Sequence, residues 1–220
     1  MPGYEPFLLC DFHVHTTWSD GRLSVRDVVD LYGQTGRFDV IAITDHILMK
    51  RDLGRPSRQA SVGSTKRSVT AQQFDGYLDD IATEAKRAKQ RYGLLVIPGA
   101  EITQKHSWSR KTTHIVVLNI REHISADQPA EGILREIERQ GAISIACHPQ
   151  HRTTRRIEIN TCYQWNHRRR LFGLIDERAA KHLYSWKALL KCDKYWGAIA
   201  EAIRSNDVAL TLYRNGSSAA

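Results

Sequence analysis

The sequence predicts an α/β fold in which strands alternate with helices and share one functional edge. Apolar runs of strand length recur at residues 8–14, 39–46, 94–103, 113–120 and 142–149. Segments with apolar residues at helical spacing separate most of these runs. Four of the five runs end in a histidine or a glutamate. These observations favour a barrel or an open sheet with a single functional face.

Composition indicates one domain in a reducing compartment. The chain has 220 residues, which we expect to form a single domain at 1–215 followed by a disordered tail at 216–220. No run approaches the roughly 20 apolar residues of a membrane span, and we expect no secretory signal. The four cysteines show no Cys-x-x-Cys spacing, which favours a cytoplasmic location. A net charge of +8 favours anionic partners, either nucleic acid or small phosphate esters, and we expect no membrane partner.

The first run carries a histidine pair at the end of a buried strand. Because side chains alternate between the two faces of a strand, Asp11, His13 and His15 are expected to share a face. Two imidazoles two residues apart can bind one cation together. Asp20, in the Ser-Asp-Gly turn that follows, adds a carboxylate close by. Taken alone, the pair could also simply fill polar space at a strand end.

A helix and a second histidine follow. The segment that begins at Ser24 resembles a capping box, and the apolar spacing after it predicts a helix that ends at Gly33 or Gly36. The second run then ends in His46. Residues 47–70 predict a long basic loop, which either contacts an anionic partner or is only solvated.

A carboxylate and a third histidine come from the next two runs. Helical spacing over 74–92 predicts a long helix. The third run ends in Glu101, and a carboxylate on a buried strand is costly unless it is paired or binds a metal. A salt bridge to an arginine is the alternative. The connection to His114 is too short for a crossover helix, so we expect a hairpin that returns His114 to Glu101.

The last part of the chain is less regular. The fifth run ends in His148, and the pattern weakens over the basic stretch 151–182. Arg152 is a candidate for clamping a phosphate, with a solvated arginine as the alternative. A last helix is expected at 195–203 and a last strand at 208–213.

The candidate ligands form one mixed set. They are His13, His15, Asp20, His46, Glu101, His114 and His148. Imidazole and carboxylate together suit zinc, manganese or iron. The set exceeds what one tetrahedral ion needs, which favours two or more ions bridged by Glu101. A multi-metal cluster of this kind holds a phosphate ester and produces hydroxide at neutral pH.

These motifs resemble the PHP (polymerase and histidinol phosphatase) superfamily of metal-dependent phosphoesterases. The matching pieces are Asp-Phe-His-Val-His-Thr with Ser-Asp-Gly, Ile-Thr-Asp-His, Gly-Ala-Glu-Ile, Thr-His-Ile-Val and Ala-Cys-His-Pro, all within residues 8–149. The resemblance implies a distorted seven-stranded (β/α)7 barrel with up to three metals at one mouth. The implied ligand groups are His13, His15 and Glu101; Glu101, His114 and His148; and Asp20 with His46.

The resemblance also implies an activity. We expect hydrolysis of a phosphomonoester, or of a phosphoester in a nucleotide or nucleic acid, by metal-bound hydroxide. The cofactors would be two or three divalent ions of zinc, manganese or iron. The partner would be a phosphorylated small molecule, a nucleotide or nucleic acid.

One departure from the family pattern leaves alternatives open. The family normally ends with a strand that carries Asp-x-His, and none follows residue 149. Residues 173–184 stand in its place, which predicts an internal deletion of a strand and two ligands. A first alternative is therefore a catalytically impaired relative that binds nucleic acid or another anionic partner. A second is an amidohydrolase, whose barrel also begins with His-x-His but uses a strand-end lysine that this chain lacks.

Overall fold

The computed structural model describes residues 7–53, 68–105, 112–147, 183, 186–214 and 217–218. Its strands are β1 Leu8–Val14, β2 Val40–Ile43, β3 His46–Leu48, β4 Leu95–Lys105, β5 Thr112–Leu118, β6 Ile143–Cys147, β7 Trp186–Leu190, β8 Val208–Arg214 and β9 Ser217–Ser218. Its helices are α1 Val25–Gln34, α2 Phe74–Tyr92, α3 Ala130–Arg139 and α5 Trp196–Arg204, with 3-10 turns at Lys50–Asp52 and Ala71–Gln73.

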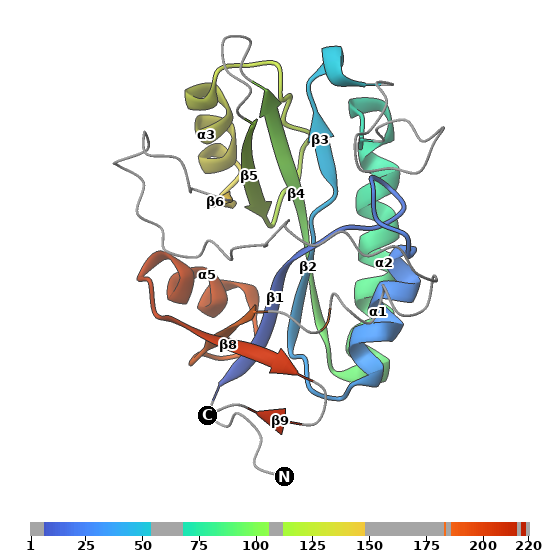
Figure 1. Cartoon of the computed structure of the whole chain (residues 1–220), viewed down its shortest axis with the longest axis vertical. Coiled ribbons are helices and arrows are strands. Elements are labelled where there is room, and N and C mark those ends of the chain that lie inside the picture. Colours follow the sequence, from blue (N-terminus) through green and yellow to red (C-terminus); the bar gives the residue numbers. More distant parts are fainter. Residues whose placement is uncertain are drawn as a thin grey trace.

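One curled sheet organises the molecule. The strand order is β6-β5-β4-β2-β1-β7-β8-β9, with β3 beside β4. Strands β1, β2 and β4 run parallel, while β5 and β6 are antiparallel to their neighbours. Helices α1 and α2 cover one face, and α5 lies on the opposite side of β1 (Figure 1). The predicted mixed α/β fold is thus confirmed as a half-barrel, and its closure into seven β/α units stays a prediction.

Two buried clusters fill the two faces of the sheet. On the face covered by α1 and α2, Ile41 and Ile43 of β2 pack with the apolar sides of those helices. On the other face, Val40 and Ala42 pack with Ile199 of α5. Alternation along β2 therefore decides which side chains face α1 and α2 and which face the concave side, where α5 lies. Among the described residues no helix combines the length and the apolar character needed to cross a membrane.

The expected N-terminal cap of α1 is present. The backbone N–H of Asp27 donates to the Ser24 hydroxyl at 3.1 Å, and the Asp27 carboxylate accepts from the Ser24 backbone. Residues Val25, Val28 and Val29 are then buried at helical spacing. This cap fixes where the connection after β1 ends, and that connection carries Asp20.

A bulge in β1 corrects one expectation. Cys10 and Asp11 pair with consecutive residues of β2, but the next paired residue of β1 is Val14, opposite Ile43. An extra residue in one strand changes the faces that follow it. Asp11 therefore lies on the helix-covered face, where it accepts from the Tyr32 hydroxyl at 2.7 Å. His13 lies on the concave face, so the expectation that both share a face is wrong.

The strand expected at 39–46 is divided into β2 and β3. Between them, the Thr44 hydroxyl accepts a hydrogen bond from Val14 N–H at 3.0 Å. After this break, β3 pairs with β4 in a register that sets His46 opposite Glu101. The division thus delivers His46 to the strand that carries the glutamate.

Strand β7 was not expected from the sequence. It runs antiparallel to β1, with Cys10 opposite Ala188. Its Lys187 is buried and its Nζ contacts the Asp11 carboxylate. The expected disordered tail, 216–220, includes β9, which pairs with the end of β8. His148, Arg152 and residues 173–182 lie outside the described residues.

Candidate metal centre

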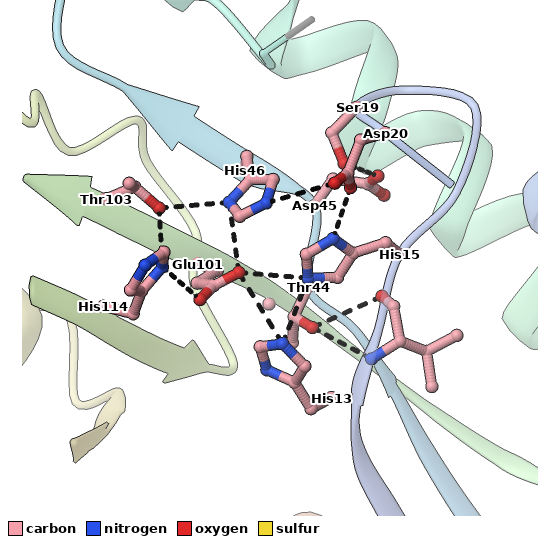
Figure 2. A network of polar contacts seen from close by, with 12 residues as sticks. His13, His15, Ser19, Asp20, Thr44, Asp45, His46, Glu101, Thr103 and His114 are labelled. Atoms are coloured by element: carbon pink, nitrogen blue, oxygen red, sulfur yellow. Dashed lines mark hydrogen bonds and ion pairs between the residues drawn. The ribbon is translucent and has the colours of Figure 1, made fainter. Parts of the chain in front are cut away.

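Six of the predicted ligands converge on the concave side of the sheet. They come from the end of β1, the loop after it, the start of β3 and the hairpin β4–β5, and they are His13, His15, Asp20, His46, Glu101 and His114. Figure 2 shows the imidazoles turned toward the glutamate. The predicted convergence is therefore seen for these six residues, while their role as ligands stays a prediction.

The Glu101 carboxylate is the centre of the cluster. Its Oε2 lies 3.1 Å from His15 Nε2, 3.1 Å from His46 Nδ1 and 3.6 Å from His13 Nε2. Its Oε1 lies 2.6 Å from His114 Nδ1. Only 3% of the side chain is exposed. A buried carboxylate with imidazoles on both oxygens is arranged to bridge cations or protons.

Asp20 extends the cluster toward solvent. One carboxylate oxygen lies 2.7 Å from His15 Nδ1, and the other lies 3.6 Å from His46 Nε2. The Asp20 side chain is 59% exposed, whereas the four imidazoles are between 16% and 24% exposed. The cluster therefore opens to solvent beside Asp20.

Thr103 belongs to the site and was missed by the sequence analysis. Its hydroxyl lies 3.1 Å from His46 Nδ1 and 3.1 Å from His114 Nδ1. The residue is buried and follows Glu101 by two positions on β4. Strand alternation places it on the same face as Glu101, and this was the signal that could have found it. Its hydroxyl restricts how both rings can turn.

The surroundings shift the pKa values of His13 and His15 in opposite directions. Burial and the neighbouring His15 lower the pKa of His13 to about 3. Burial also acts to lower the pKa of His15, but hydrogen bonds with Asp20 and Glu101 outweigh it and raise that pKa to about 10. Burial would raise the pKa of Glu101, yet contacts with His114 and His15 hold it well below its ordinary value. A positive charge at His15, between the carboxylates of Asp20 and Glu101, is therefore favoured.

The spacing of the donor atoms fits a metal. Two ligands each about 2.1 Å from an ion at the tetrahedral angle lie about 3.4 Å apart. His13 Nε2 and His15 Nε2 are 3.2 Å apart, and both lie 3.1–3.6 Å from the same Glu101 oxygen. Groups of three ligand atoms also form from His15, Asp20 and His46, and from His46, Glu101 and His114.

The loop after β1 is held by close packing. A Cβ on Gly21 would lie 2.5 Å from the backbone carbonyl of His15 and from the nitrogen of Thr16, so only glycine allows this approach. The Trp18 indole N–H donates to the Asp80 carboxylate at 2.8 Å and so ties the loop to α2. Asp20 therefore reaches the cluster on a loop that is fixed at both sides.

A comparison with solved structures finds a protein of similar fold. The chain is similar to a two-domain protein from Bacteroides vulgatus ATCC 8482 that contains a predicted PHP-like metal-dependent phosphoesterase. The TM-score is 0.56 at 17% identity, and the match covers 97% of this chain and 67% of that chain. The resemblance read from the motifs is therefore confirmed at the level of the fold.

Other comparisons are weaker. A candidate metal-dependent phosphoesterase from Bifidobacterium adolescentis ATCC 15703 matches with a TM-score of 0.30 and 23% identity, over 50% of this chain and 27% of that chain. An amidohydrolase from Chromobacterium violaceum, with bound sulfate and no metal, matches with a TM-score of 0.31 and 25% identity, over 59% of this chain and 32% of that chain. No protein-family model and no curated protein matches the sequence.

Proposed function

We propose that the chain is a member of the PHP superfamily and hydrolyses a phosphoric ester with the help of divalent metal ions. The observation that carries the proposal is the surrounding of one buried carboxylate, Glu101, by four imidazoles. A cluster that served only to stabilise the fold would not need so many potential ligands within reach of one oxygen pair.

The donor groups suggest how ions would be shared. His13, His15 and Glu101 would hold one ion, and Glu101 with His46 and His114 would hold another. A divalent ion supplies positive charge for phosphoryl oxygens and lowers the pKa of a water molecule. Zinc, manganese and iron all accept this mixture of imidazole and carboxylate. The three groups of possible ligands share His15, His46 and Glu101 between them, so two ions are the simplest complement.

The chain's own residues suggest how an ester would reach the site. The exposed carboxylate of Asp20 marks the open side of the cluster. The Thr103 hydroxyl keeps His46 and His114 turned toward Glu101. The formal charge of +8 favours an anionic substrate such as a nucleotide, a nucleic-acid end or another phosphomonoester. Arg152 remains a proposed phosphate clamp on sequence grounds.

Phosphate release after metal depletion and reloading tests the proposal. The protein would be stripped with a chelator and then given Mn²⁺, Zn²⁺ or Fe²⁺, with p-nitrophenyl phosphate, mononucleotides and short RNA as substrates. We expect turnover with at least one ion, and its loss in Glu101→Gln. Glu84→Gln is the matched control, because Glu84 is a second buried glutamate that pairs with Arg87 on α2.

Two results would count against this function. Folded protein that releases no phosphate with any of the three ions contradicts it. Salt-dependent binding of RNA without turnover would favour the impaired relative instead.

A further inference from the structure

The loop that carries Asp20 is bound to one buried carboxylate outside the cluster of candidate ligands. Asp45 Oδ1 accepts from the Thr16 backbone N–H at 2.8 Å and from the Ser19 hydroxyl at 2.5 Å. Its Oδ2 accepts from the Thr16 hydroxyl at 2.7 Å. Figure 2 shows Asp45 beneath Ser19 and Asp20.

Because these groups are buried, the hydrogen bonds between them are costly to lose. Asp45 and Thr16 are fully buried, and Ser19 is 2% exposed. A buried carboxylate needs hydrogen bonds to replace its lost hydration. All the side-chain hydrogen bonds that Asp45 accepts within the described part of the chain come from this one loop. If the loop moved away, the Asp45 carboxylate would either become exposed to water or stay buried without hydrogen-bond donors.

The backbone of Asp45 reaches the rest of the cluster. Its carbonyl accepts from the Glu101 N–H at 2.9 Å, and its own N–H donates to the Tyr77 hydroxyl at 3.2 Å. The next residue is His46. One residue thus connects the loop that bears Asp20, the histidine of β3 and the glutamate of β4.

We propose that Asp45 is a positioning residue that holds the Thr16–Ser19 loop so that Asp20 faces His15 and His46. Ser19 points down to Asp45 while the neighbouring Asp20 points to His15, so the two contacts fix opposite sides of the loop. An exposed carboxylate without this anchor would sample many orientations. The consequence for ion binding rests on the proposed function, whereas the consequence for the loop does not.

Variants of the loop hydroxyls test this role. Ser19→Ala and Thr16→Val remove one donor each with little change in volume, and Thr16→Ser keeps the hydroxyl. The matched control is Ser24→Ala, which removes the cap of α1 in the same connection, because the Ser24 hydroxyl bonds to Asp27.

Two measurements are made on the full chain. Amide hydrogen exchange followed by mass spectrometry reports the loop at 15–20, and titration of chelator-stripped protein with Mn²⁺ reports ion affinity. We expect faster exchange of the loop and about tenfold weaker Mn²⁺ binding in Ser19→Ala and Thr16→Val. Thr16→Ser should recover most of both, and Ser24→Ala should change neither by more than about twofold.

The outcomes separate the two proposals. Unchanged loop exchange in both Ser19→Ala and Thr16→Val would overturn the positioning role, as would equal effects in Ser24→Ala. Wild-type protein that binds no Mn²⁺, Zn²⁺ or Fe²⁺ would end the proposed function, and loop exchange would still decide the role of Asp45. Asp45→Asn serves as an additional variant if it folds.

Discussion

His114 Nδ1 lies 2.6 Å from Glu101 Oε1, although the register of β4 and β5 pairs His114 with Thr103 instead. The contact is therefore diagonal across the hairpin. The antiparallel return of β5 brings His114 to the glutamate, as the short connection predicted. Glu101 thus has imidazoles on both sides, with His13 on β1 and His15 directly after it.

Removing His114 should weaken only part of the ion binding. In His114→Ala, the group formed by His13, His15 and Glu101 stays complete. We expect one class of ion to bind at least about tenfold more weakly and the other to be retained. Competition with a chromophoric chelator would measure both. His123→Ala is the control, because His123 packs against Phe74, outside the group, and a similar loss there would argue against specific ligation.

Gly21→Ala should damage the site without removing a ligand. The added Cβ would lie 2.5 Å from the His15 backbone, so the loop must move away. We expect weaker Mn²⁺ binding and a loss of stability of about 1–3 kcal/mol. Gly76→Ala is a suitable control, since its nearest contact would be Trp18 at an ordinary 3.7 Å. Urea unfolding with parallel Mn²⁺ titration measures both effects, and an unaltered affinity in Gly21→Ala would contradict the packing described.

Lys187→Met should destabilise the fold strongly. Lys187 Nζ contacts Asp11, which also accepts from the Tyr32 hydroxyl. Removing one partner of a buried ion pair leaves the other charge uncompensated, at a cost of about 3–5 kcal/mol. The double variant Asp11→Asn with Lys187→Met should regain part of that stability. Urea unfolding tests this, and a single variant as stable as wild type would show that β7 is not held to β1 by the pair.

The ion pair between Asp30 of α1 and Arg87 of α2 should make the free energy of unfolding decrease at acid pH. The Arg87 guanidinium beside Asp30, 2.6 Å away, holds the pKa of that carboxyl below its usual value. The contribution is therefore present above the unfolded pKa of about 3.9 and is lost as pH falls through the lower folded pKa. It should amount to about 0.5–1 kcal/mol.

Asp30→Asn should remove that pH dependence. Unfolding free energies of wild type and variant would be compared between neutral pH and acid. Asp79→Asn, at an exposed position of α2, gives the reference slope. A difference between wild type and Asp30→Asn that does not shrink toward acid pH would contradict the assignment.

Local patterns predicted the elements that local interactions determine. The cap at Ser24, the helix that ends at Tyr92 and the return of His114 all follow from residues near one another in sequence. The convergence on Glu101 followed from strand ends that meet at one edge of a sheet. These features needed no knowledge of the tertiary structure.

Contacts between distant residues account for what was missed. The β1 bulge lies where Val14 bonds Thr44, 30 residues away, and strand alternation contains no sign of it. Strand β7 carries a lysine at its second position, which breaks the apolar pattern expected of a buried strand. Its partner Asp11 lies 176 residues away. Only the assembled sheet shows why both charges are tolerated.

Metal content is the most direct test of the central claim that the imidazoles and carboxylates around Glu101 bind a cluster of metal ions. The protein would be purified without chelator, and its zinc, manganese and iron would be measured by elemental analysis per folded chain. We expect about two ions per wild-type chain, with most of them lost in Glu101→Gln. Less than about half an ion per chain, or equal content in Glu101→Gln, would contradict it.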